Sequence, residues 1–231
     1  MKKGKMKPVN VNAFDILGNI AAGGQIAFGA AVQGESAGYA VAVPDLCHNI
    51  LGIVDWDLVE RTVDGFYSTY DLLPIITAGR VRVWVTAVHT TSENVAADEY
   101  LEIADLGGTN LLPIGVFQVM DAETGTKVGA TRQVGSLARA LEDVTLQSAE
   151  VIPSAVTIGD TTVTMTAAGL IDTLSVGDYI LLEDITDQAM INRVKSIDST
   201  TQITLQIAST VALDGSTDVM HKLEQVEALL L

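Results

Sequence analysis

The feature that most constrains the fold is an alternating segment at residues 81–87. Valines occupy every second position from Val81 to Val85, and arginine, tryptophan and threonine lie between and after them. Alternation with period two, carried by β-branched residues, predicts a strand with one face in a core. The apolar run at 71–76 precedes it, and Gly79 lies in the short gap between the two. We therefore expect a β-hairpin over residues 71–87.

The rest of the chain continues as strand-sized pieces separated by turn residues, with weak helical periodicity. Such spacing is typical of all-β folds. We predict an all-β protein, an antiparallel β-barrel or sandwich with a second small β-barrel module at the C-terminus. The predicted divisions are a basic arm at 1–9, a barrel or sandwich domain at 10–149 and a small β-domain at 150–231.

Within the second module, the pattern predicts a Gly-Asp turn and strand over 174–182 and a hairpin joining 191–198 to 202–205. Residues 151–154 contain a proline, break the strand pattern and suggest a linker. The apolar tail at 219–231 fits either a helix face or a last strand.

Composition narrows the choice of partners. Hydrophobic residues make up 48% of the 231 residues, charged residues only 18%, and the net charge is −16. Because nucleic-acid binding needs a basic footprint, we expect no nucleic-acid partner. The uncharged stretch at 16–34 is rich in glycine and includes amide side chains, which favours turns and bulges over a membrane span. The apolar composition suggests surface that is covered in an assembly, or simply an alanine- and valine-rich β protein.

Candidate chemistry is sparse. The single cysteine, Cys47, precedes His48, and two further histidines lie at His89 and His221, but no metal-ligand spacing connects them. We predict no metal and no cofactor.

Two acidic pairs, Asp55 with Asp57 and Asp98 with Glu99, have the residue types of a glycosidase. Their setting in acidic turns favours solvated surface instead. Ser136 follows a glycine, but its segment VGSLA at 134–138 is not the GxSxG pattern of a nucleophile elbow. We predict no catalytic residues and no enzyme activity.

The N-terminal arm is the one basic part of the chain. Four of the 13 basic residues lie in its first eight positions, which end with Pro8, and residues 9–14 alternate as a first strand would. A basic arm on an acidic body is either a solvated terminus or a tether to an acidic surface. The residues that we predict to contact a partner are Lys2, Lys3, Lys5, Lys7, Val9 and Val11.

Two parts of the chain together resemble a known family. The order 51–54 (LGIV), 65–67 (GFY), 74–75 (PI) and 79–85 (GRVRVWV), followed by 136–144 (SLARALEDV), resembles the capsid cement, or decoration, proteins of tailed bacteriophages. The resemblance spans about residues 10–146. Where that family often has a Gly-Asp turn before the apolar strand, this chain has Thr69-Tyr70-Asp71.

The resemblance implies a virion structural protein on the outer capsid surface that stabilises the assembled shell. It implies the major capsid protein as partner, and a homo-oligomer, with a trimer favoured. The alternative is a carbohydrate- or cell-surface-binding β-module of a fibre or adhesin, which clustered exposed aromatic residues would favour; Trp56 and Trp84 are far apart in the sequence. A third option is a hydrolase with an unrecognised site.

Overall fold

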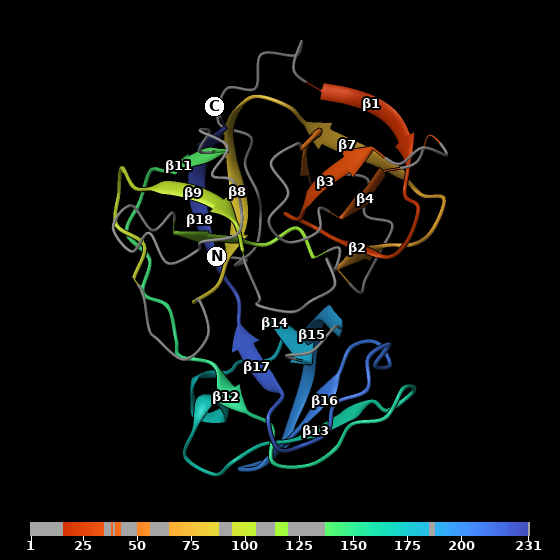
Figure 1. Cartoon of the computed structure of the whole chain (residues 1–231), viewed down its shortest axis with the longest axis vertical. Coiled ribbons are helices and arrows are strands. Elements are labelled where there is room, and N and C mark those ends of the chain that lie inside the picture. Colours follow the sequence, from red (N-terminus) through yellow and green to blue (C-terminus); the bar gives the residue numbers. More distant parts are fainter. Residues whose placement is uncertain are drawn as a thin grey trace.

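The structure, a computed structural model, confirms the all-β prediction. It describes residues 16–34, 38, 40–42, 50–55, 65–87, 94–104, 114–119, 137–184 and 188–230. Two lobes follow one another along the long axis (Figure 1). The only helical element in the described ranges is a short 3-10 helix, η1 (Leu170–Thr173).

The first lobe contains an open sheet and a closed barrel. In spatial order, the sheet holds β1 (Ile16–Ala21), β7 (Leu72–Ile76), β5 (Gly52–Val54), β3 (Ala31–Gly34) and β4 (Ala40–Ala42), all antiparallel. The barrel holds β10 (Phe117–Val119), β8 (Gly79–Val85), β18 (Glu224–Leu230), β11 (Ala138–Ala140) and β9 (Tyr100–Ile103). Its one parallel pair is β10 with β8. A small ribbon pairs β2 (Ile26–Ala27) with β6 (Phe66–Tyr67).

The second lobe is built on one six-stranded sheet. Its strands, in spatial order, are β12 (Glu150–Val151), β17 (Val219–Lys222), β14 (Tyr179–Asp184), β15 (Gln188–Ser199), β16 (Gln202–Leu205) and β13 (Thr162–Thr164). The β15–β16 hairpin occurs as the sequence predicts. The Gly-Asp turn also occurs, and it leads directly into β14.

The second lobe is an insertion in the barrel rather than a domain that follows it. The chain leaves the barrel after β11, builds β12 to β17, and returns as β18 between β8 and β11. Glu150 at the start of the lobe lies opposite Met220 near its end, so entry and exit are adjacent. This placement differs from the predicted division, because residues 224–230 lie in the first lobe. Their alternating Val226, Ala228 and Leu230 fill the barrel core.

The predicted hairpin over residues 71–87 is wrong in its pairing. Both strands exist, as β7 and β8, but β7 pairs with β1 and β5 while β8 pairs with β18 and β10. The chain turns a corner at Gly79 and passes from the open sheet into the barrel. The alternation in β8 is confirmed, because its valines lie in the barrel core and Trp84 lies in the core of the open sheet.

The predicted linker at 151–154 is also wrong. Val151 belongs to β12, and Ile152 is fully buried in the core of the second lobe. The tail at 219–230 forms two strands and no helix face.

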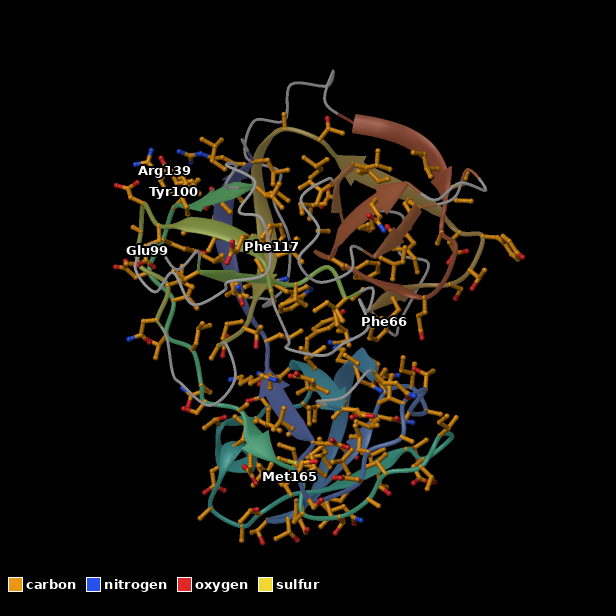
Figure 2. All side chains as sticks on the ribbon, in the orientation of Figure 1. Phe66, Glu99, Tyr100, Phe117, Arg139 and Met165 are labelled. Atoms are coloured by element: carbon orange, nitrogen blue, oxygen red, sulfur yellow. The ribbon has the colours of Figure 1, made fainter. Side chains whose placement is uncertain are left out.

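Apolar packing joins the two lobes. Along β14, Ile180 and Leu182 face the core of the second lobe, whereas Tyr179 and Leu181 pack into the core of the first. Because successive side chains of a strand point to opposite faces, β14 serves both cores. Figure 2 shows Phe66 on the side of the first lobe that faces the second, and Met165 within the second lobe.

Candidate functional site

Among the described residues, one turn geometry occurs four times, and a strand follows it each time. In each case the first residue's N–H donates to the carboxylate of the fourth residue at 2.7–2.9 Å. The fourth residue's N–H donates back to the first carbonyl at 3.0–3.2 Å. The third residue always has a positive φ. The turns cover residues 68–71, 96–99, 157–160 and 175–178.

The third position of this turn suits glycine, because a side chain there clashes with the backbone. Gly159 and Gly177 occupy it in the second lobe, at φ of 98° and 97°. Asp98 occupies it in the barrel at 75°, which short polar side chains tolerate best after glycine. Tyr70 occupies it at 74°, and a bulky residue in this conformation is a genuine outlier.

Tyr70 is also the most exposed large apolar side chain in the described part of the chain, at 69%. Its neighbour Leu72, at the start of β7, is 59% exposed. Backbone bonds hold the pair in place: Tyr70 N–H donates to the Ala22 carbonyl, and Ala22 N–H donates to the Asp71 carbonyl, both at 2.8 Å. We call Tyr70 with Leu72 the tyrosine knob. The chain entering β7 loops out at the right-hand margin of the first lobe (Figure 1).

The electrostatics of this turn type come from its carboxylate. In the equivalent turn at 157–160, hydrogen bonds from the Thr157 backbone and hydroxyl lower the pKa of Asp160. Because these hydrogen bonds are made to the charged carboxylate, they favour the ionised form of Asp160. The side chain of Asp160 therefore holds the turn rather than transferring a proton. In the turn at 68–71, the Ser68 N–H to Asp71 carboxylate bond and the Asp71 N–H to Ser68 carbonyl bond close the backbone, so the turn can present its third residue in a fixed position. Tyrosine is one of the residue types enriched at the hot spots of protein interfaces, so an exposed tyrosine held by a closed turn suits contact with a protein partner.

The positive φ of Tyr70 costs stability, so we expect the residue to have a role that compensates for this cost. Strained conformations persist where the surrounding structure enforces them, and they cluster at functional sites. The sequence singles out Tyr70-Asp71 only as a departure from a Gly-Asp turn. Alignment with Gly159-Asp160 and Gly177-Asp178 within the same chain is the signal that would have identified Tyr70 as a candidate site residue.

The acidic pairs considered for catalysis are engaged in structure where they are described. Asp98 forms an ion pair with Arg139 at 2.9 Å, and the Glu99 carboxylate closes its own turn. Figure 2 shows Glu99 and Arg139 on the outer side of the barrel with Tyr100. Asp55 directly follows β5, and its backbone carbonyl accepts a bond from the Tyr67 hydroxyl at 3.1 Å. Asp57 lies outside the described residues.

Several predicted positions are not described. The predicted contact residues lie outside the described ranges: Lys2, Lys3, Lys5, Lys7, Val9 and Val11. Cys47, His48, His89, Trp56 and Ser136 also lie outside them. The candidate ligand His221 is described, and its ring is buried against Glu183 rather than exposed. Trp84 is buried as well, which removes it as a stacking platform for a sugar.

No His, Cys, Asp or Glu side chains of the described residues form a group of three or more that could hold a metal ion. A helix long and apolar enough to cross a bilayer does not occur in the described ranges. No protein-family model matches the chain, and neither a curated protein nor a solved structure shows significant similarity to it.

Proposed function

We propose that this chain is a capsid decoration protein, which binds the outer surface of a tailed-virus capsid and stabilises the assembled shell. The observation that carries the proposal is the tyrosine knob, a strained and exposed aromatic residue at a turn position that holds glycine or aspartate in the equivalent turns of this chain. The sequence resemblance over about residues 10–146 supports the same class of function. The apolar composition, 48% hydrophobic, is consistent with surface that becomes covered in an assembly.

In this function the tyrosine knob inserts into a pocket of the major capsid protein. Tyrosine buries a large area at small conformational cost, and a preformed turn reduces the cost further. A homo-oligomer, with a trimer favoured, makes several such contacts at once at a symmetry axis of the shell. Multivalent contact then bridges capsid subunits without requiring any single tight interface.

The basic arm has a complementary role in the proposal. Its lysines, Lys2 to Lys7, reach an acidic neighbouring surface, and Val9 with Val11 adds a strand to a sheet edge of the capsid. The contact is salt-dependent because it rests partly on charge. The knob contact is apolar and should persist as salt rises.

The test uses capsids that lack the protein, with size-exclusion chromatography and light scattering on the mixture. The key variant is Tyr70→Gly, which removes the ring and relieves the backbone strain together. We expect capsid affinity to fall about 30-fold, the loss of one interface hot spot. The free energy of unfolding should stay unchanged or rise by up to about 1 kcal/mol.

Asp98→Gly is the matched control, because Asp98 holds the same position of the same turn in the barrel. It loses only an exposed ion pair with Arg139, and capsid affinity should not change. A wild-type protein that stays monomeric and never co-elutes with capsids overturns the proposed function and directs attention to glycan binding. Co-elution that Tyr70→Gly leaves intact refutes the role of the tyrosine knob.

A further inference from the structure

The second lobe ends on one side with a strand whose outer edge is unpaired in the described part of the chain. This strand is β13, at the margin of the six-stranded sheet, and it pairs there with β16. Met165 N–H donates to the Thr201 carbonyl at 2.7 Å, on the side of β13 that faces β16. Because successive residues of a strand point their N–H and carbonyl groups to opposite sides, those of Thr162 and Thr164 point away from the sheet.

The other outer strands of the open sheets are at least partly covered. In the first lobe, Ala22 follows β1 and forms a parallel bridge to Ala40 of β4, so the two margins of that sheet meet. In the second lobe, the Glu150 carboxylate of β12 accepts from Thr166 N–H at 2.8 Å and from Leu170 N–H. The Thr166 bond also ends the free stretch of β13. What remains open is a template for an extended segment of another chain.

The side chains of β13 state what such a segment must look like. Val163 is fully buried in the core of the second lobe, whereas Thr162 before it is exposed. A strand that adds to this edge should therefore carry apolar residues on the core face and polar residues on the other. Residues 9–14 of this chain (VNVNAF) begin with valine and asparagine in alternation. They lie outside the described residues and directly follow the lysines of the basic arm.

The charge near the edge is complementary to that arm. Asp160 lies in the turn that precedes β13, and Asp198 accepts from the hydroxyl of Thr204, the residue opposite Thr162, at 2.6 Å. Hydrogen bonds from Thr204 to Asp198 and from Thr157 to Asp160 lower the pKa of both carboxyl groups, so both are charged at neutral pH. Acidic residues outnumber the basic ones in the described residues of this lobe, which are Arg193, Lys195 and Lys222. Lysines should therefore be attracted to this edge.

We propose that the free edge of β13 accepts the N-terminal segment of a second copy of this chain. Residues 9–14 add a strand to the sheet, and the lysines before them lie against its carboxylates. Figure 1 shows β1 and β13 near opposite ends of the molecule, so an arm would have to extend along both lobes to reach its own β13. A contact between copies is head-to-tail, and it closes into a ring where the rotation allows, as a trimer requires.

The proposal goes beyond the capsid function, because it concerns the free protein and is tested without capsids. The proposed function offers the same arm to a sheet edge of the capsid. An arm pairs with one edge at a time, so a capsid edge competes with β13 for it. Until a capsid binds, pairing between copies covers an edge that would otherwise invite aggregation.

Sedimentation velocity on the full chain over a range of concentrations tests the proposal. Thr162→Pro removes an N–H that points outward, so the ladder between β13 and β16 stays intact. The variant should weaken self-association at least about tenfold. Thr162→Ala is the matched control, because it shortens the same side chain and keeps the N–H, and its self-association should match that of the wild type. A wild type that is monomeric at every concentration, or self-association that Thr162→Pro leaves intact, overturns the proposal.

A variant of the arm tests the identity of the occupant. Val11→Asp places a charge on the apolar face of the arriving strand, beside carboxylates, and should weaken self-association as much as Thr162→Pro does. Combining the two should cause no further loss, because both remove the same contact. Losses that add in the double variant show two separate contacts and overturn the pairing of the arm with β13.

Hydrogen exchange of the wild type decides the matter even if Thr162→Pro does not fold. The Thr162 and Thr164 amides have no partner in the described part of the chain, so they should exchange freely in dilute protein. In concentrated protein they should exchange at least about tenfold more slowly. Amides that stay unprotected while the protein self-associates overturn the proposal. Failure of the capsid function has a different sign, since it appears as a lack of co-elution with capsids.

Discussion

Tyr179 is the residue whose replacement most directly measures the junction between the lobes. Its ring centroid lies 4.5 Å from that of Trp84 and 5.8 Å from that of Phe66, both in the first lobe. Its hydroxyl donates to the Gly65 carbonyl at 2.9 Å. Tyr179→Phe keeps the ring and its packing and removes only this bond, so the effect on stability can be assigned to one contact.

We expect Tyr179→Phe to lower the free energy of unfolding at pH 7 by about 1 kcal/mol, the net value of one such bond. The larger cost of an orphaned carbonyl does not apply, because Gly65 also accepts from Phe28 N–H at 3.4 Å. Tyr179→Ala, which removes the ring as well, should cost about 3–5 kcal/mol. Urea denaturation followed by tryptophan fluorescence and circular dichroism measures both variants.

Alkaline pH should reverse the order of the wild type and Tyr179→Phe. Burial raises the pKa of Tyr179 from 10.0 to about 12, and Arg193 opposes this only in part. A raised folded pKa favours the neutral form, so the contribution is complete below pH 10 and is lost as pH rises towards 12. The loss amounts to about 2 kcal/mol at pH 12, and the two stability curves should cross between about pH 10.5 and 11. Curves that stay parallel up to pH 12 would refute the burial of the hydroxyl.

Two further predictions concern the barrel and one tight approach in the open sheet. Deleting residues 224–230 removes a strand that pairs with both β8 and β11, so cooperative unfolding of the first lobe should disappear in calorimetry; an unchanged melting profile contradicts the insertion topology. At Gly52 (φ +155°) an added Cβ would overlap the Ile76 carbonyl oxygen, whereas at Gly79 (φ +100°) it meets nothing within 4 Å. Gly52→Ala should therefore cost more than about 3 kcal/mol and Gly79→Ala about 1 kcal/mol, and equal costs in urea denaturation argue against the close approach.

Local patterns in the sequence predict the strands well. The alternating valines of β8 predict both the strand and its two faces, because side-chain alternation is a property of the strand alone. The β15–β16 hairpin is similarly local, since its strands are joined by a short turn. The Gly177-Asp178 turn can be predicted for the same reason. Glycine supplies the positive φ and aspartate supplies the hydrogen-bond acceptor, and both lie within the same four residues.

Pairing between distant strands is what the sequence does not reveal. The residues of β7 and β8 are compatible with a hairpin. The hairpin does not form because β1 pairs with β7 and β18 pairs with β8. The position of Ile152 beside Pro153 suggests a linker, but Ile152 is buried in the core of the second lobe. Likewise, no neighbour in the sequence predicts the contacts of His221, and only the fold places Glu183 and Thr86 beside its ring.

The insertion of the second lobe also sets an order of folding. During synthesis β18 emerges only after the whole second lobe, so β8 and β11 must wait for the strand that lies between them. The second lobe has its own core, and its strands β14 to β16 follow one another, which suits early and rapid folding. The first lobe depends on a contact between distant parts of the chain and should form last. Its unpaired strand edges are meanwhile exposed to other chains, so crowded synthesis at high temperature should produce aggregates through the barrel.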